Sequence, residues 1–297
     1  MNEGFSDELK AGAAATEAML DRLLAVGRAG APERLTEAMR HAALGPGKRL
    51  RPFLLIEAAR VFGMTGEGVV RAAAALECVH CYSLVHDDLP AMDDDDMRRG
   101  RPTVHKAFDE ATAILAGDGL LTLAFAILAD PATDPDPKVR VELIAGLAAA
   151  SGVEGMVGGQ ALDLAAEQGK PRDAEIRTLQ AMKTGALFRF ACEAGAILGR
   201  ASPDKRRRLA DFGSALGLAF QIADDLIDAT GKAAKAGKAT AKDAGRGKAT
   251  LVGLYGVTVA TQMLDKAVED AVALLVPLGT QGERLSAAAR FAGSRDS

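Results

Sequence analysis

Two stretches of the sequence carry aspartates at spacings that suit the binding of a divalent cation. The first, HDDLPAMDDDDMRRG, runs from His86 to Gly100 and holds six aspartates before it turns to arginine. Carboxylates this close together repel one another, while the whole chain has a formal net charge of only −4. A hard cation bound by oxygen ligands would remove that repulsion. The stretch therefore predicts a site for a cationic partner that the sequence itself does not supply.

The second stretch is FQIADDLID, from Phe220 to Asp228, inside an otherwise apolar helical pattern. Asp224 and Asp228 are four residues apart, so both lie on one helical face, with Asp225 beside them. Taken alone, this spacing is more typical of charge on a helix surface than of a metal site. Together with the first stretch, however, it predicts two acidic faces that clamp a multiply charged anion through Mg²⁺.

Basic residues at three places could bind the same class of anion. Lys48 and Arg51 stand where GKRLR opens a helix, and helix N-termini favour phosphate. Arg98 and Arg99 follow the first acidic stretch, and Lys183 interrupts a later helix. Each could be a solvated charge when considered alone. In combination they predict two diphosphate sites, one built on metal and one on lysine and arginine.

The elements that must position these residues are predicted to be helices throughout. Alanine and leucine are abundant, tryptophan is absent, only two tyrosines occur, and alternating β-branched runs are scarce, so the fold class is all-α. We expect helices over about 6–27 with Ser6 as N-cap, from Pro32, and over 48–62, 69–88, 109–129, 138–150, 154–168, 173–198, 203–230 and 251–275. No repeat or domain-scale linker interrupts them, and we expect a single domain over residues 1–297.

Composition and charge argue against several classes of protein. The net charge of −4 and isoelectric point near 5.7 give no reason to expect nucleic acid as a partner. The beginning, MNEGFSDELK, has neither the basic region nor the apolar core of a secretory signal, and no uncharged apolar run reaches the roughly 18 residues of a membrane span. We expect a soluble, cytoplasmic protein.

Three cysteines, Cys78, Cys81 and Cys192, do not form a disulfide framework. The pair Cys78 and Cys81 could indicate zinc or redox chemistry, with His80 between them. No second ligand pair accompanies it, and a spacing of three residues in an apolar helix favours two small buried side chains.

Together the motifs resemble those of the trans-isoprenyl diphosphate synthase family, most closely its bacterial farnesyl diphosphate synthases. The resemblance covers residues 45 to about 255, through GKRLRP, HDDLPAMDDDDMRRGRPTVH, GGQALDL, KTGALF and FQIADDLID. It implies an antiparallel helix bundle around a deep central cavity, a homodimer, and two aspartate motifs that face each other at the cavity mouth.

The resemblance also assigns roles to individual residues. It implies that three Mg²⁺ ions bridge the allylic diphosphate to Asp87, Asp88, Asp93, Asp224, Asp225 and Asp228. The isopentenyl diphosphate site would comprise Lys48, Arg51, His80 and Arg99. The allylic diphosphate would be held by Arg98, Lys183, Thr184, Gln221 and Lys238, with Gln160 and Asp163 as a polar pair lining the cavity.

Residues 231–248, GKAAKAGKATAKDAGRGK, look like a solvated loop by composition. The resemblance implies that they form a flexible lid in which Lys238, Asp243 and Lys248 are in register with the family. Here the chain departs from the family pattern, since Ala249 replaces a usual serine and Leu251 and Val252 replace the usual Tyr-Pro.

The resemblance implies that Tyr82, together with its small neighbour Ser83, determines the chain length of the product. Tyr82 lies five residues before Asp87, roughly 7.5 Å down a helix axis, where an aromatic ring in this family is associated with the C15 product. The alternative is that Tyr82 is ordinary core packing.

The implied reaction is ionisation of the allylic diphosphate, in which Asp87, Asp93, Asp224 and Lys183 take part, followed by attack of isopentenyl diphosphate. The alternatives are a geranylgeranyl diphosphate synthase, a terpene cyclase or a non-catalytic subunit of a prenyl synthase. A cyclase would not need Lys48, Arg51 and His80, and a non-catalytic subunit would be expected to lack one of the two aspartate motifs.

Overall fold

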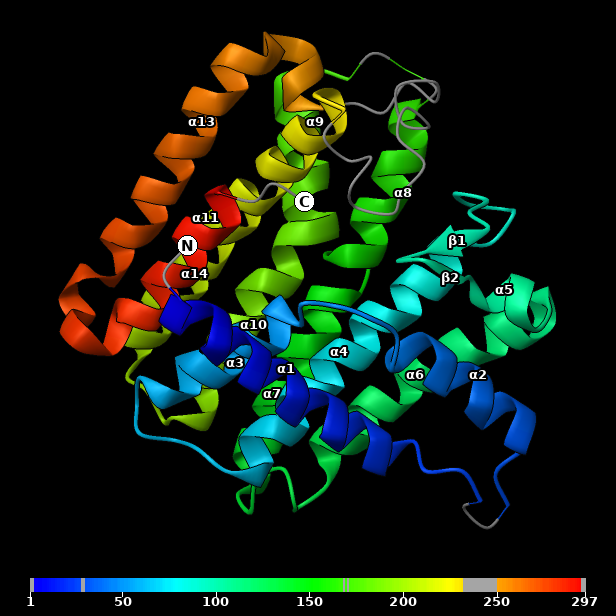
Figure 1. The fold of residues 1–297 in the computed structure, drawn as a ribbon. Coiled ribbons are helices and arrows are strands. Elements are labelled where there is room, and N and C mark those ends of the chain that lie inside the picture. The colour runs from blue at the N-terminus through cyan, green and yellow to red at the C-terminus, as the bar shows by residue number, and fades with distance from the viewer. Residues whose placement is uncertain (1–2, 28–29, 168, 170, 232–249, 295–297) are drawn as a thin grey trace.

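The computed structural model describes residues 3–27, 30–167, 169, 171–231 and 250–294. Regular structure in these residues is almost all helical, as expected (Figure 1). The elements are α1 (Glu3–Leu23), α2 (Glu33–Ala43), α3 (Leu50–Arg60), α4 (Glu67–Asp87), β1 (Met97–Arg98), β2 (Arg101–Pro102), α5 (Val104–Ala107), α6 (Glu110–Ala129), α7 (Pro137–Ser151), α8 (Met156–Glu167), α9 (Asp173–Gln180), the π-helical turn η1 (Ala181–Gly185), α10 (Ala186–Leu198), α11 (Pro203–Ala229), α13 (Leu251–Leu275), η3 (Val276–Gly282) and α14 (Glu283–Gly293).

Helix α4 runs through the middle of the bundle and ends at the first aspartate motif. Its residues Ala72 to Val79 are all buried, because α3, α6, α1 and α10 pack around it. Small side chains, such as the four consecutive alanines from Ala72 to Ala75, let these neighbours approach closely. The buried surroundings of α4 thus fix the position of the aspartates at its C-terminal end.

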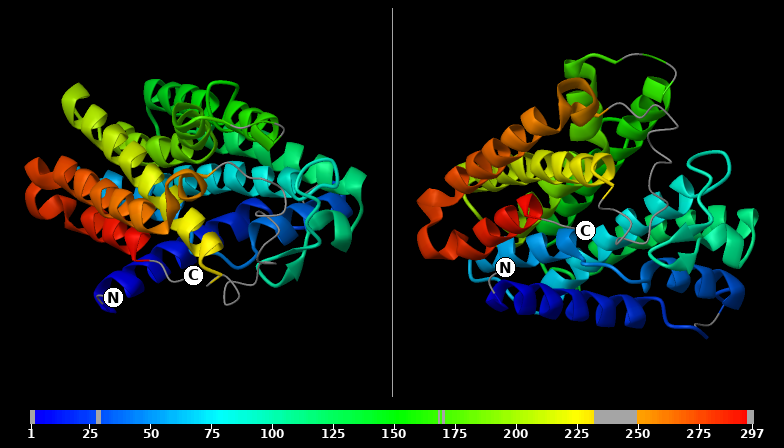
Figure 2. Two further views of the ribbon diagram at one scale, coloured as in Figure 1. Left: turned by 90° about the horizontal axis from the view of Figure 1, so that it is seen from above. Right: turned by 45° about the horizontal axis from the view of Figure 1, so that its top comes forward.

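The second aspartate motif lies near the end of α11, which packs along α13 and against α10 (Figure 2). Pro203 stands at the first turn of α11, where its missing N–H costs nothing. Apolar residues including Phe212, Leu216 and Ile222 face the neighbouring helices. This packing leaves Asp224 half-buried and Asp228 exposed on the outer part of the helix.

Several helix boundaries differ from the expected ones for identifiable reasons. The prediction of Ser6 as an N-cap was wrong, because α1 already includes Glu3. The single helix expected over 173–198 is interrupted by the π turn at Ala181–Gly185. The short hairpin of β1 and β2, helix α5 and helix α14 were not expected. A two-residue strand is too short to show a period.

Three segments have the length and hydropathy of membrane spans: Glu67–Asp87, Glu110–Ala129 and Pro137–Glu167. In α4 packing explains this character, because 72% of its most apolar window is buried inside the fold. The most apolar windows of the other two segments are only 39% and 33% buried. Their exposed apolar residues include Ile114, Leu115, Val141, Val153 and Val157.

The cysteines are buried and free, as expected for packing residues. Burial raises the pKa of the Cys78 thiol well above its usual value and that of Cys81 to about 12. Both thiols are therefore protonated and unreactive near neutral pH.

Candidate active site: two aspartate motifs and an arginine cluster

The first aspartate motif is folded back on itself at the end of α4. Asp87 is the last residue of that helix. The backbone N–H of Asp93 donates to the carbonyl oxygen of Asp87 at 2.7 Å, and that of Asp95 donates to the carbonyl of Asp88 at 3.1 Å. These turns return the chain to the helix end and bring Asp93 beside Asp87.

The carboxyl group of Asp87 is strongly affected by this setting. Burial raises its pKa to about 6, and the charges of Asp93 and Asp88 act in the same direction. Lys183 on η1 and Arg98 oppose that increase. Lys183 therefore lies close enough to α4 to interact with the first motif, although it is nearly a hundred residues away in the sequence.

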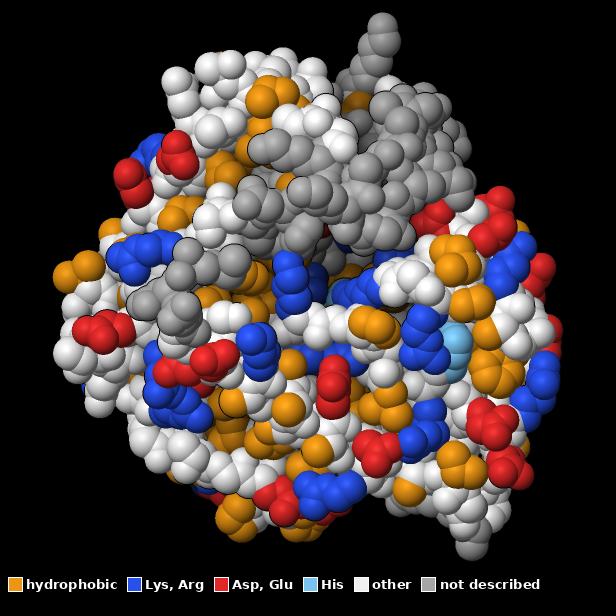
Figure 3. All heavy atoms as spheres, in the orientation of Figure 1, with side chains coloured by type: hydrophobic (Ala, Val, Ile, Leu, Met, Phe, Trp, Pro, Cys, Tyr) orange, Lys and Arg blue, Asp and Glu red, His pale blue; other side chains and the backbone are white. Residues whose placement is uncertain are grey.

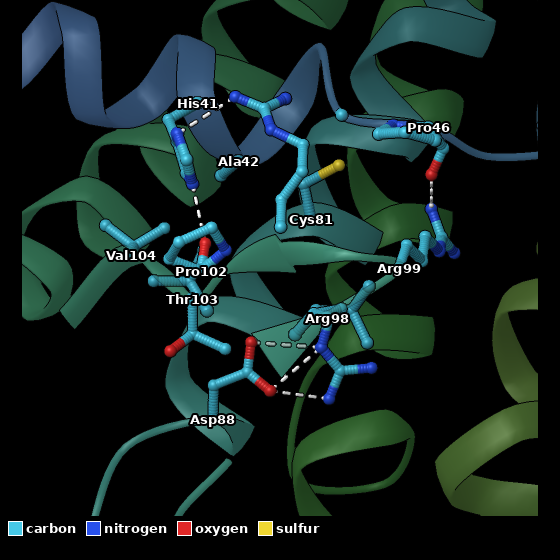
Figure 4. A pocket seen from close by; sticks show the side chains of 14 residues that line it. His41, Ala42, Pro46, Cys81, Asp88, Arg98, Arg99, Pro102, Thr103 and Val104 are labelled. Carbon is cyan, nitrogen blue, oxygen red and sulfur yellow. Dashed lines mark hydrogen bonds and ion pairs between the residues drawn. The ribbon is translucent and has the colours of Figure 1, made fainter. Parts of the chain in front are cut away.

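Asp88 is held by Arg98 in the pocket drawn in Figure 4. The Arg98 Nε donates to both carboxylate oxygens at 2.8 and 2.9 Å, and Nη2 donates to Oδ1 at 2.6 Å. Burial raises the pKa of Asp88 and the Arg98 hydrogen bonds lower it, with a net increase. Asp88 and Arg98, which the sequence assigned to metal and to allylic diphosphate, thus bind each other in this structure.

The second motif is anchored through Asp225. The residue is 7% exposed, and its carboxylate accepts hydrogen bonds from the amide nitrogens of Gln180 and Gln221, each at 2.9 Å. Burial is the main cause that raises its pKa to about 7, and the charges of Asp224 and Asp228 add to it. The Gln221 oxygen accepts a hydrogen bond from the Thr184 hydroxyl at 2.8 Å, which ties α11 to η1.

Lys183 lies on the π turn and forms an ion pair with Asp163 of α8. A π turn inserts one residue into a helix and is frequent at functional sites. Gln160, the predicted partner of Asp163, has a buried side-chain oxygen with no hydrogen-bond partner in the described structure. The structure therefore brings Lys183, Thr184, Asp163 and the two motifs to one end of the bundle.

The predicted basic site gathers around His80 on α4. Burial lowers the pKa of His80 well below its usual value, and Arg51, Arg99, Arg98 and Arg49 add to the effect. His80 is consequently neutral at pH 7 in a strongly positive environment. Lysine and arginine side chains also gather near the middle of the face in Figure 3.

Aromatic rings support two of these cations. The Arg51 guanidinium lies over the ring of Phe188 with its carbon 4.6 Å from the centroid, and 5.9 Å from that of Phe220. The Lys48 ammonium lies 5.4 Å from the ring centroid of Phe291 on α14. Such contacts stabilise a cation without neutralising it.

Arg99 completes the cluster from the β1–β2 turn. It takes a left-handed backbone conformation with φ 52°, and its Nη1 donates to the carbonyl oxygen of Pro46 at 2.8 Å. This bond joins the turn to the segment that precedes α3.

Tyr82 and Ser83 lie one turn before the first motif. Tyr82 is 5% exposed, and the Ser83 hydroxyl donates to the His80 carbonyl at 2.9 Å. Lys238, Asp243 and Lys248 lie outside the residues that the structure describes, so their assignments stay predictions.

Two features of the site were missed by sequence reasoning. Asp94, Asp96 and His105 form, within the described chain, a group of three whose ligand atoms all lie within 4.8 Å. Two of its members belong to the first acidic stretch, but the predicted ligands Asp87, Asp88 and Asp93 are not among them. The second missed feature is the buried pair of Arg49 and Glu77, whose side chains are 1% and 3% exposed. The only available signal was an arginine in GKRLR and a glutamate in an apolar helix.

Comparisons with known proteins agree with this architecture. Residues 32–274 match the polyprenyl synthetase family. The chain is 46% identical to the farnesyl diphosphate synthase of Escherichia coli K12, with 85% of each chain covered, and 40% identical to that of Geobacillus stearothermophilus, with 99% of this chain and 98% of the relative covered.

A solved structure shows the same fold over the whole chain. The FPP/GFPP synthase from Zymomonas mobilis, in its apo form, superposes with a TM-score of 0.90 at 45% identity, over 99% of this chain and all of that one. The fold is thus the all-α fold of the isoprenyl synthases, and the chain belongs to the polyprenyl synthetase family.

Proposed function

We propose that the protein is an Mg²⁺-dependent farnesyl diphosphate synthase that condenses isopentenyl diphosphate with dimethylallyl and then geranyl diphosphate. One observation carries the proposal: two acidic motifs and a separate arginine cluster converge at one end of the bundle. Lys183 faces Asp87, whereas His80 is surrounded by arginines. A metal-bound diphosphate and a metal-free diphosphate fit these two environments.

The acidic motifs suit Mg²⁺ in their donor chemistry and electrostatics. Their donors are carboxylate oxygens, which this ion prefers. The pKa values of Asp87 and Asp225, raised to about 6 and about 7, report desolvated carboxylates next to like charges, and a cation would relieve both. We assign Asp87 and Asp93 on one side and Asp224, Asp225 and Asp228 on the other to hold three ions. Asp88 would take part on release from Arg98.

The reaction begins at the bond between C1 of the allylic substrate and its diphosphate oxygen. When bound, Mg²⁺ neutralises charge on the departing diphosphate. Lys183 and Thr184 bind the same anion, which accumulates charge as the C–O bond breaks and keeps the bonding electron pair. Stabilisation of that anion lowers the barrier, so no protein nucleophile is needed.

The second substrate is bound as a diphosphate by Lys48, Arg51 and Arg99, beside neutral His80. Its double bond attacks the allylic cation and forms the new C–C bond. The resulting cation loses a proton to the released diphosphate. Loss of this proton forms the double bond of a new allylic diphosphate that is five carbons longer. Arg51, seated on Phe188 and Phe220, positions this substrate relative to α10 and α11.

The proposal includes a cytoplasmic homodimer formed by one domain over residues 1–297. Exposed apolar residues on α6, α7 and α8, such as Leu115, Val141 and Val157, support burial against a second copy. The alternative product is geranylgeranyl diphosphate, which differs only in the number of condensations.

The test is incubation of the purified protein with Mg²⁺, isopentenyl diphosphate and geranyl diphosphate, with products separated by chain length. We expect mainly the C15 product and none in the presence of excess chelator. A mainly C20 product would replace the farnesyl assignment, and failure to condense the two substrates would refute the proposed activity.

A further inference from the structure

Arg49 lies between two residues of the predicted isopentenyl diphosphate site but faces away from solvent. Its side chain is 1% exposed, whereas its neighbour Lys48 is exposed. Arg49 caps the start of α3 in a left-handed conformation with φ 49°. This left-handed residue stands between Lys48 and α3, the helix that carries Arg51.

The Arg49 guanidinium is bonded on all sides. Nη1 donates to Glu77 of α4 at 2.7 Å, and Nε donates to Glu17 of α1 at 3.2 Å. Nη2 donates to the carbonyl oxygen of Ala43 at 2.9 Å and also to that of Gly45. One side chain thus ties the segment before α3 to two helices of the bundle.

Arg99 contacts the same segment. A Cβ placed on Gly47 would lie 2.5 Å from the Arg99 Nη1 and 3.2 Å from the Arg49 Nη1. The two guanidinium groups therefore pass close to Gly47, where a larger residue would require the end of the Arg99 side chain to move. Arg49 binds the carbonyl of Gly45, and Arg99 binds that of Pro46.

Glu77 supplies the buried negative charge in this arrangement. Its residue exposure is 2%. Burial lowers the pKa of Arg99, with Arg49 and Arg98 acting in the same direction, and Glu77 is the largest opposing charge. Without Glu77, two closely placed guanidinium groups would repel each other in a desolvated site.

We infer that Arg49 and Glu77 are positioning residues that hold Lys48, Arg51 and Arg99 in the geometry that binds the metal-free diphosphate. Neither side chain needs to contact the substrate. Arg49 shapes the backbone between Gly45 and Arg51, and Glu77 keeps Arg49 and Arg99 together. The inference deepens the proposed function, since it concerns the isopentenyl diphosphate site of that reaction.

The first test measures the binding of inorganic diphosphate by calorimetry, in excess chelator so that the aspartate motifs do not contribute. Glu77→Gln keeps the shape of the side chain and removes its charge. We expect its affinity to fall about tenfold, which corresponds to roughly 1.4 kcal/mol. Unchanged affinity in Glu77→Gln would overturn the inference.

Asp134→Asn is the matched control. Asp134 is also 3% exposed and pairs with an arginine, Arg200, at 2.7 and 2.8 Å, but it joins the loop after α6 to the one before α11. We expect this variant to lose thermal stability and to bind diphosphate like the wild type. An equal loss of affinity in both variants would mean that stability alone explains the effect, and would refute the positioning role.

A double variant separates positioning from folding. Replacement of a buried ion pair by apolar residues of similar volume is often neutral or stabilising, so Arg49→Met with Glu77→Met should recover thermal stability relative to Glu77→Gln. Its diphosphate affinity should stay low, because the bonds to Ala43 and Gly45 are lost. Recovery of affinity together with stability would contradict the inference.

Steady-state kinetics give the corresponding result for the reaction. In Glu77→Gln the KM for isopentenyl diphosphate should increase about tenfold, while that for geranyl diphosphate stays within about twofold. If the wild type did not condense these substrates but the calorimetric differences were observed, the proposed function would be wrong and the inference about the anion site would stand.

Discussion

The ring of Tyr82 meets the imidazole of His86 edge-on, with 5.8 Å between the ring centroids and 78° between the planes. The His86 Nε2 donates to the carbonyl oxygen of Ile114 at 3.0 Å. Gly117 of α6 leaves room for this ring, because a Cβ there would lie 2.0 Å from Nε2. Tyr82 therefore packs against His86, whose own side chain is hydrogen-bonded to α6.

The packing of Tyr82 against His86 bears on the predicted role of its ring in product length. In Tyr82→Ala we expect a shift from the C15 product to C20 or longer, because the tail can then extend along α4. The measurement is the chain-length distribution of the products at equal substrate consumption. Tyr255→Ala, at the other tyrosine of the chain, should leave the distribution unchanged. An unaltered distribution in Tyr82→Ala would exclude the ring as the floor of the cavity.

The two aspartate motifs should act as one unit. Asp87→Asn and Asp224→Asn each remove one charge from a set that must neutralise a diphosphate, so we expect turnover to fall by about 10²-fold or more in each. Circular dichroism should report unchanged helical content. Asp211→Asn, an exposed residue on α11, is the control and should remain fully active. Full turnover of either variant with chelator present would argue against the metal site.

Lys183 and Arg51 should affect different substrates. Lys183 interacts with Asp87 and pairs with Asp163. We therefore expect Lys183→Gln mainly to weaken the binding of the allylic substrate and to slow its ionisation. Arg51→Gln should mainly raise the KM for isopentenyl diphosphate, by about tenfold or more. Both constants would be measured for each variant, with Lys10→Gln on α1 as a control. If Lys183→Gln mainly affected isopentenyl diphosphate and Arg51→Gln mainly affected the allylic substrate, the assignment of the two diphosphate sites would have to be exchanged.

Glu57 predicts a pH dependence of stability away from the site. Its side chain is 5% exposed and accepts hydrogen bonds from Arg60 and Arg284 at 2.8 and 3.3 Å. Burial raises its pKa to about 7, against 4.5 for an ordinary glutamate, and Arg284 only partly opposes this. Between these two pH values the unfolded chain loses the proton while the folded protein retains it, so stability falls as pH rises, by on the order of 3 kcal/mol.

Glu57→Gln removes this loss, since glutamine does not titrate. Relative to the wild type, its free energy of unfolding should therefore increase between pH 4.5 and pH 7.5 and stay level above that. Urea unfolding followed by circular dichroism at several pH values measures the difference. Glu67→Gln, at a side chain 61% exposed, should show no such trend. A constant difference for Glu57→Gln would show that its pKa is close to normal.

Much of the helical frame could be predicted from the sequence. The bounds of α13 agree with the expected 251–275, and those of α4 and α11 agree within two residues at each end. Proline at Pro203 and apolar periodicity are local signals, and they report local structure reliably. The first aspartate motif was conspicuous because of its charge density, and the second gained its interpretation from the first.

The parts that were missed depend on contacts between distant segments. The pairing of Arg49 with Glu77 joins residues 28 positions apart, and nothing in either local sequence specifies the partner. The π turn at Ala181–Gly185 keeps helical composition, so propensity does not distinguish it from an α-helix. The bonding of Asp88 by Arg98 likewise depends on how the hairpin folds back over α4.

Left-handed backbone at Arg49, Asp94, Arg99 and Arg200 has a consequence for engineering. Each non-glycine residue in this conformation costs about 1 kcal/mol or more relative to glycine. A library selected only for heat resistance should therefore accumulate glycine at such a position only where the interactions of the native side chain contribute less than this. At Arg200 the change would remove the ion pair with Asp134. At Arg49 it would leave the buried Glu77 without this partner, and at Arg99 it would remove a residue of the proposed anion site. Directed evolution of a more thermostable variant should therefore include a screen for turnover in every round.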